Sequence, residues 1–135
     1  MATRSFASHL DALAEVFAFS AAGFAREGIE LALLPTVDLC LEELFTNLVK
    51  YGRSAAPIQI ELRGIEGGVE VSLVAEDVDD FDPTRGPAVD TTLALDQRQP
   101  GGLGLHLVRR LVDSIEYEYQ DTPRRSRVTF RKTQA

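Results

Sequence analysis

The stretch LEELFTNLVKYG, residues 41–52, gives the clearest indication of how this chain folds. At about 100° per residue, an apolar stripe lies within roughly 60° of Val37. Its other members are Cys40, Leu41, Leu44 and Leu48. This pattern predicts a helix that begins near Pro35, a residue tolerated in a first turn, and ends near Gly52.

A polar row follows one edge of the same stripe. Glu43, Asn47 and Lys50 fall at roughly 220–280° from Val37, so they border the core face and could wall a cleft. A charged surface row, worth a few tenths of a kcal/mol, is the alternative. Spacing alone favours that alternative, because charged helix edges are common.

The flanking segments predict three further elements. Residues 2–6 suit a short strand, and residues 8–28 have apolar residues at helical spacing. Ser8 with Asp11 suggests a capping box at the start of this helix, and Gly28 suggests its end. Residues 57–65 and 69–77 alternate apolar and polar side chains around 66–68, which predicts a hairpin.

The C-terminal third returns to regular patterns after a long loop. Residues 82–102 hold three of the six prolines and no clear periodicity, and such a loop is usually functional or mobile. A helix is predicted next, with Leu103, Leu107, Leu111 and Ile115 in line. Residues 115–121 and 126–132 alternate as strands around a turn.

This order of elements predicts the fold class. The order β-α-α-β-β-loop-α-β-β favours an α+β two-layer sandwich, in which helices cover one face of a mixed, mostly antiparallel sheet. The 135 residues suit a single domain, and 44% hydrophobic with 26% charged residues fits a globular protein.

Composition also excludes several classes of function. A net charge of −7 argues against general nucleic-acid binding and leaves room for a basic protein partner. No apolar run approaches the roughly 20 residues of a membrane span, and the N-terminus lacks a signal pattern. We therefore expect a cytoplasmic protein. Cys40, the one cysteine, is expected to be a buried structural thiol.

Two loops carry the other candidate sites. GGLG, residues 101–104, opens a helix, and glycines at a helix start let an anion approach backbone N–H groups. A glycine-rich hinge without a ligand is equally possible from this motif alone, and it is not a Walker A loop. VAEDVDDFDP, residues 74–83, holds five acids within seven residues. A calcium loop counted from Asp77 is rejected, because Ala88 occupies its twelfth position. Two interpretations of this acidic stretch remain. It is a solvated turn, or one of its carboxylates accepts a hydrogen bond from the amino group of a base.

Together these stretches resemble the GHKL ATPase superfamily, and in particular its small bacterial anti-sigma-factor serine/threonine kinases. The resemblance covers about residues 5–132. EELFTNLVKYG resembles the N box, EDVDDFDP occupies the adenine-binding box, GGLGLHLVRRLVD resembles the glycine-rich box, and SRVTFRK resembles the closing strand. The combination is specific, whereas no single motif is.

The resemblance implies a role for each matching residue. Asn47 would coordinate Mg²⁺ at the phosphates of ATP, Glu43 would be the catalytic base, and Lys50 would neutralise phosphate charge. Residues 82–102 would form a flexible ATP lid, and Thr129 would support the adenine carboxylate. The nucleotide-binding residues implied at the two remaining boxes are Glu76, Val78, Gly101, Gly102, Leu103, Gly104 and Leu105.

One departure from the family pattern concerns the adenine box. Glu76 and Val78 stand where the family has aspartate and glycine. A β-branched residue is strained where glycine supplies unusual dihedrals. Either Asp77 takes over the carboxylate role, or nucleotide binding is weak or lost; we expect it to be retained.

The resemblance further implies a function and partners. The chain would be an anti-sigma factor with ATP- and Mg²⁺-dependent serine/threonine protein kinase activity. Its substrate would be a STAS-type anti-sigma-factor antagonist, and it would release a sigma factor by partner switching, in the regulation of stress-response transcription. Kinases of this type act as homodimers. The alternatives are a non-catalytic module of the same fold that binds the sigma factor or antagonist, and a bare ATPase or nucleotide sensor.

Overall fold

The computed structural model describes residues 1–85 and 101–134, without the side chains of 101–103. Most of the expected lid, 82–102, therefore lies outside the described residues. The elements come in the predicted order. They are β1 (Ala2–Phe6), α1 (Leu13–Glu27), α2 (Leu34–Tyr51), β2 (Ile58–Ile65), β3 (Gly68–Glu76), α3 (Gly101–Leu111), β4 (Ser114–Asp121) and β5 (Arg124–Thr133), with short 3-10 turns at Leu10–Ala12 and Leu31–Leu33.

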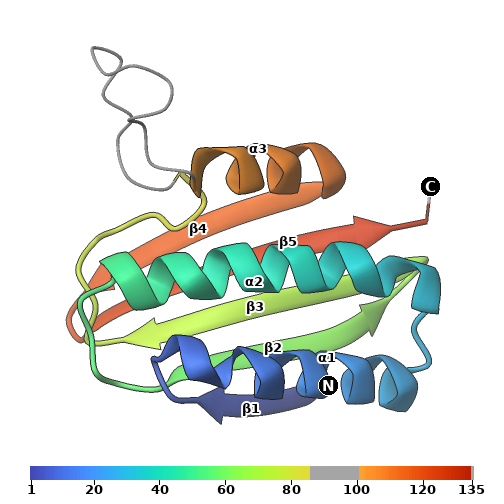
Figure 1. Ribbon diagram of the computed structural model, residues 1–135, viewed down its shortest axis with the longest axis horizontal. Helices are drawn as coiled ribbons and strands as arrows, with labels where there is room; N and C mark the ends of the chain where they lie inside the picture. The colour runs from blue at the N-terminus through green and yellow to red at the C-terminus, as the bar shows by residue number, and fades with distance from the viewer. Residues whose placement is uncertain (86–100, 135) are drawn as a thin grey trace.

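The described strands form one five-stranded sheet in the order β1-β2-β3-β5-β4. All four pairings are antiparallel, so the expected mixed sheet is antiparallel throughout the described chain. Figure 1 shows α1, α2 and α3 side by side over one face of this sheet. The predicted two-layer α+β architecture is confirmed.

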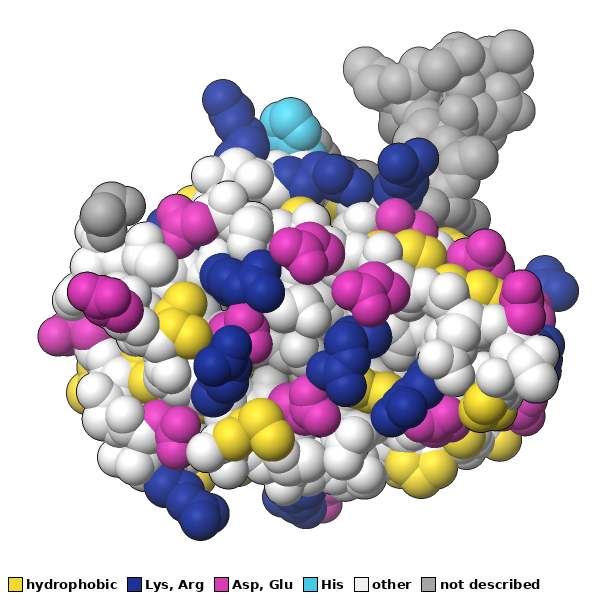
Figure 2. All heavy atoms as spheres, turned by 180° about the vertical axis from the view of Figure 1, so that it is seen from behind, with side chains coloured by type: hydrophobic (Ala, Val, Ile, Leu, Met, Phe, Trp, Pro, Cys, Tyr) yellow, Lys and Arg dark blue, Asp and Glu magenta, His cyan; other side chains and the backbone are white. Residues whose placement is uncertain are grey.

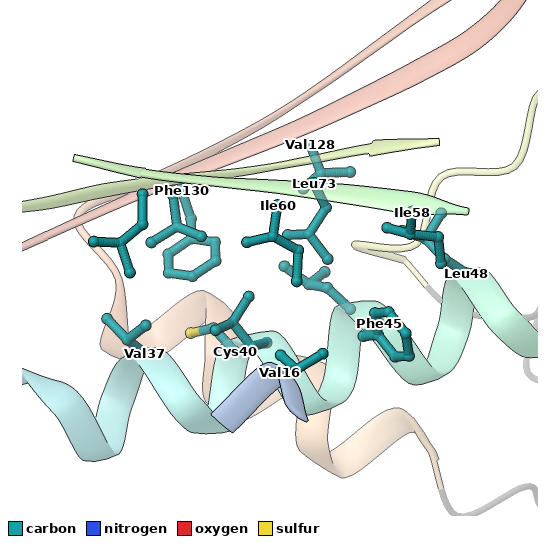
Figure 3. Close-up of a cluster of buried hydrophobic side chains, with 14 of the residues drawn as sticks. Val16, Val37, Cys40, Phe45, Leu48, Ile58, Ile60, Leu73, Val128 and Phe130 are labelled. Atoms are coloured by element: carbon teal, nitrogen blue, oxygen red, sulfur yellow. The ribbon is translucent and has the colours of Figure 1, made fainter. Parts of the chain in front are cut away.

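The core lies between α2 and the sheet. The predicted stripe of α2 is buried, with Val37, Cys40, Leu41 and Leu44 fully inaccessible. These side chains meet Ile60, Leu73, Val128 and Phe130 of the sheet (Figure 3). Burial raises the pKa of the Cys40 thiol to about 12, which fits the structural role expected of it.

Two details of the helices correct the sequence analysis. At the start of the first helical segment, His9 rather than Ser8 is the cap: its Nδ1 accepts a hydrogen bond from the Asp11 N–H. On α3, the buried residues are Leu105 and Val108, whereas Leu107 and Leu111 of the expected stripe are exposed. Ile115 belongs to β4, so it could not continue that stripe.

The other face of the sheet is open and highly charged. Figure 2 shows basic and acidic side chains interspersed across it. Arg127 pairs with Glu61, and Arg131 pairs with Glu70 and Glu116. The sheet therefore has one open, charged face and one face covered by helices. A cleft between the helices and the sheet can lie only on the covered face.

Candidate functional site

Packing of α2 against α3 brings Glu43 to Gly104, so two motifs 61 positions apart in the chain meet. A Cβ added at Gly104 would overlap the Glu43 carboxylate. Any residue other than glycine would have to displace that carboxylate, because non-bonded heavy atoms settle about 3.5–4.0 Å apart. Gly104 therefore leaves room for the Glu43 carboxylate beside the α3 backbone, although that carboxylate is the end of a flexible, partly exposed side chain that can rotate away.

The Glu43 carboxyl is partly buried at this contact. Burial raises its pKa above the ordinary value, and the neighbouring Glu42 carboxylate raises it further. The Lys50 ammonium acts in the opposite direction, although its side chain is exposed at the end of α2. Glu43 thus has the properties of a carboxylate that can accept a proton.

Asn47 lies one helical turn beyond Glu43 and is buried, with 4% of its surface exposed. Asn47 is therefore more deeply buried than the border position expected from its spacing. Its Nδ2 donates a hydrogen bond of 3.0 Å to the Pro83 carbonyl. This bond uses the Nδ2 end of the amide.

The acidic loop after β3 is attached to the β4–β5 hairpin. Arg124 pairs with Asp77 at 2.7 Å and with Asp79 at 3.0 Å. Tyr117 donates to Asp80 at 2.8 Å, and the Tyr119 hydroxyl donates to the Val78 carbonyl at 2.9 Å. Asp77, which the sequence analysis considered for base recognition, is therefore paired with Arg124.

Glu76 faces the open side of the sheet. It shares the orientation of Ser72 along β3, because residues two or four apart lie on one face, and its carboxylate pairs with Arg125 at 3.0 Å. Asp77, the other candidate, is largely exposed and paired with Arg124. Neither carboxylate lies between the helices and the sheet.

Val78 is buried in the core cluster beside the end of α2. Its Cγ1 is 3.5 Å from the position that a Cβ at Gly52 would take. The expected strain is absent at Val78 itself: Asp77 adopts the left-handed conformation instead, with φ 52°. Aspartate tolerates this region better than a β-branched residue does. Valine therefore fits the backbone and packs into the core beside the end of α2.

Thr129 lies on the face of the sheet that the helices leave open. Its hydroxyl lies 2.8 Å from Ser72 Oγ on the open face of the sheet, while its neighbours Val128 and Phe130 enter the core. The hydroxyl of β5 on the helix-covered face is that of Ser126, paired in register with Ala75 and only 2% exposed. Its Oγ has no partner in the described structure. Counting the strand alternation from Val128 would have found Ser126.

The glycine-rich box is divided between the site and the core. Gly101 and Gly102 begin α3, and the side chain of Leu103 lies outside the description. Leu105 is buried in the core cluster, so only its backbone could meet a nucleotide. An open hollow near Glu27 and Gly67 lies elsewhere; none of the candidate residues lines it.

The residues fit Mg-ATP at one end of the site and not at the other. At the phosphate end, the amide oxygen of Asn47 suits Mg²⁺, which prefers oxygen ligands, and α3 begins with N–H groups that attract phosphate. The described residues contain no group of three acidic, histidine or cysteine side chains that could hold a metal alone. At the base end, Val78 and the outward-facing Glu76 do not fit an adenine.

Comparison with known proteins agrees with this geometry. The model of the histidine kinase-like ATPase domain matches residues 6–132, which is nearly the whole chain. The chain therefore belongs to the histidine kinase-like ATPase domain family.

One curated relative can be named within that similarity. The chain is similar to the serine/threonine-protein kinase BtrW of Bordetella bronchiseptica, with 33% identity over 88 residues. The alignment covers 64% of this chain and 62% of BtrW, so the chain matches less than two thirds of its relative. No helix in the described residues has the length and apolarity to cross a membrane.

Proposed function

We propose that this protein is an ATP- and Mg²⁺-dependent serine/threonine protein kinase of the anti-sigma-factor type. The observation that carries the proposal is the contact of Glu43 with Gly104, one helical turn from the buried Asn47 amide. Membership of an ATPase family and similarity to a serine/threonine kinase support the same activity.

The proposed roles follow from position and charge. Glu43 accepts the proton of the substrate hydroxyl, a role that its raised pKa favours. Asn47 Oδ1 holds the cation, and Lys50 offsets phosphate charge. The N–H groups at Gly101, Gly102 and Gly104 orient the phosphates. When bound, ATP supplies the phosphoryl group that is transferred.

The proposed substrate is a STAS-type anti-sigma-factor antagonist, and the second partner is a sigma factor released by partner switching. The acidic net charge of −7 suits a basic protein partner rather than nucleic acid. A homodimer is proposed by resemblance, and sedimentation of the protein with and without each partner tests both assemblies.

Thermal melting with and without Mg-ATP is the first test. A ligand at 100 times its dissociation constant adds about 2.7 kcal/mol of stability, so a bound nucleotide raises the melting temperature. Transfer of labelled phosphate to a co-encoded STAS protein then distinguishes a kinase from a bare ATPase or nucleotide sensor.

Three variants test the roles of the α2 residues. Glu43→Ala should abolish transfer and keep the melting shift, whereas Asn47→Ala should reduce both. Glu30→Ala is the control, because Glu30 is an exposed glutamate that precedes the same helix and does not contribute to the raised pKa of Glu43. Transfer by the Glu43 variant at the rate of the Glu30 variant would remove Glu43 from the role of base.

A second candidate function rests on the base end of the site. Val78 fills space there and Glu76 faces away, which favours a non-catalytic module that binds a sigma factor or an antagonist. This candidate predicts no melting shift with Mg-ATP, together with a stable complex with the sigma factor or antagonist on gel filtration.

A further inference from the structure

Arg109 on α3 holds the segment that follows the acidic loop. Its Nε and Nη2 donate to the Thr84 carbonyl at 3.1 and 2.8 Å, and Nη2 also reaches the Thr84 hydroxyl at 3.1 Å. Thr84 is only 5% exposed. Its N–H and hydroxyl both donate to Asp82 Oδ1, at 2.9 and 2.6 Å. Every polar group of Thr84 is therefore held.

The same segment holds Asn47. The Pro83 carbonyl, which accepts the hydrogen bond of Asn47 Nδ2, belongs to the peptide group whose N–H is that of Thr84. Because a peptide group is planar, the direction of the Thr84 N–H, which Asp82 holds, fixes the direction of the Pro83 carbonyl. Arg109 restrains the same residue through its carbonyl and hydroxyl, on the other side of this peptide group. A side-chain amide is planar too, so the position of Nδ2 determines where Oδ1 points.

We infer that Arg109 is a positioning residue for Asn47: through Thr84 and Pro83 it sets the direction of the amide oxygen proposed to hold the cation. This inference rests on the proposed function for its consequence. Arg109 itself need not contact nucleotide. This series of hydrogen bonds runs from Arg109 on α3 to Asn47 on α2. It connects the glycine-rich box to the N box separately from the Glu43–Gly104 contact.

The fork of an arginine suits this task. Two N–H groups of one guanidinium reach one carbonyl oxygen, and a third contact reaches the hydroxyl beside it. Lysine offers a point charge without the fork geometry. The neighbouring Arg110 makes no hydrogen bond or ion pair with any described residue and is equally exposed, so it is a matched control.

The first readout needs no nucleotide. Asn47 is the only asparagine of the chain, so labelling with ¹⁵N-asparagine gives a single side-chain NH₂ pair by NMR. In the wild type and in Arg110→Ala, one proton of this pair should be protected from exchange with solvent by its bond to Pro83. In Arg109→Ala that protection should be lost, and Arg109→Lys should regain part of it.

The second readout is the dependence of ATP affinity on Mg²⁺. Partners that orient a metal ligand typically contribute about 10–100-fold in metal affinity. The ratio of ATP dissociation constants in EDTA and in Mg²⁺ should therefore fall by about tenfold or more in Arg109→Ala, and stay unchanged in Arg110→Ala. If Arg109→Ala lost ATP affinity equally with and without Mg²⁺, Arg109 would only stabilise the local structure, and the inference would be overturned.

Two further results separate the possible failures. A wild type that shows no melting shift with Mg-ATP contradicts the proposed function, whereas an unchanged Asn47 pair in Arg109→Ala contradicts the positioning role. If Arg109→Ala does not fold, Thr84→Val takes its place. It removes the hydroxyl, and with it the contacts to Arg109 Nη2 and Asp82 Oδ1, and leaves the Thr84 carbonyl in place. It should therefore weaken the protection of the Asn47 pair in the same direction; an unchanged pair overturns the inference.

Discussion

The carboxylate of Glu43 occupies the space beside Gly104 that any side chain at position 104 would need. This contact joins α2 to the start of α3 and leaves the carboxylate partly buried. The packing of the two helices therefore explains why a residue without a side chain suits position 104. The same approach places backbone N–H groups of a helix start near a proton acceptor, which is an arrangement suited to phosphate chemistry.

Gly104→Ala should destabilise the protein only slightly, because the Glu43 carboxylate that its Cβ displaces is the end of a flexible, partly exposed side chain. The loss in urea unfolding should therefore stay below the roughly 1–3 kcal/mol that overpacking costs in a well-packed core. The double variant Gly104→Ala/Glu43→Ala should recover much of it, since the obstructing carboxylate is gone. A loss that is fully additive in this double-mutant cycle would show that the two residues do not compete for the same space.

Glu43→Gln should make the protein more stable near neutral pH. The pKa of Glu43 is raised in the folded state, mainly by burial, so the folded protein binds this proton more tightly than the unfolded chain. Stability contributed by the group therefore falls as pH rises from about 4.5 through the raised pKa. Glutamine removes that loss.

Melting curves of the wild type and Glu43→Gln across this range provide the measurement. The advantage of the variant should shrink as pH falls below 4.5, where the wild-type carboxyl is protonated in both states. Glu30→Gln, at an exposed position that precedes the same helix, should show no such crossover. An advantage for Glu43→Gln that is independent of pH would contradict the assigned cause.

Much of the fold follows from the sequence because it depends on periodicity. The stripe from Val37 to Leu48 predicted which face of α2 is buried, and the alternation of 57–65 and 69–77 predicted the hairpin but not its register, in which Ile65 pairs with Gly68. The approach of Glu43 to Gly104 depends on how two helices pack, which no local pattern contains.

The orientations of several side chains could not be predicted from the sequence, and each has a physical cause. Thr129 and Ser126 differ by three positions, and an odd step in a strand moves a side chain to the other face of the sheet. On α3, the direction of the apolar face depends on the sheet beneath it: Val108 is buried, whereas Leu107 remains exposed. The outward pairing of Glu76 depends on Arg125 of a strand about 50 positions away.

Arg124→Ala should loosen the acidic loop in a manner that depends on salt. Arg124 pairs with both Asp77 and Asp79, and all three side chains are substantially exposed. Exposed pairs contribute little and are screened, with a Debye length of about 3 Å at 1 M salt. The variant should therefore melt slightly lower than the wild type in low salt and at the same temperature in high salt.

Arg110→Ala is the control for this comparison, because Arg110 has no ion pair with the described residues. It should melt like the wild type at both salt concentrations. A deficit for Arg124→Ala that persists at high salt would mean that packing of the arginine stem, rather than its charge, holds the loop.

Val78→Ala should weaken the fold and strengthen nucleotide binding. Val78 is 3% exposed, and removing its two methyl groups from the core should cost roughly 1.5–3 kcal/mol in urea unfolding. The space released lies at the base end of the site, beside Gly52. Titration of wild type and variant with Mg-ATP should therefore give a lower dissociation constant for the variant, despite its lower stability.

Val74→Ala separates the two effects of this substitution. Val74 is 1% exposed on the same strand but shares the orientation of Ser72 rather than that of the core residues Leu73 and Ala75. Its truncation should cost similar stability without tightening nucleotide binding. Equal dissociation constants for wild type and Val78→Ala would show that Val78 does not obstruct the base. If neither protein binds Mg-ATP while both bind a sigma factor or antagonist, the non-catalytic module is the better account of the protein.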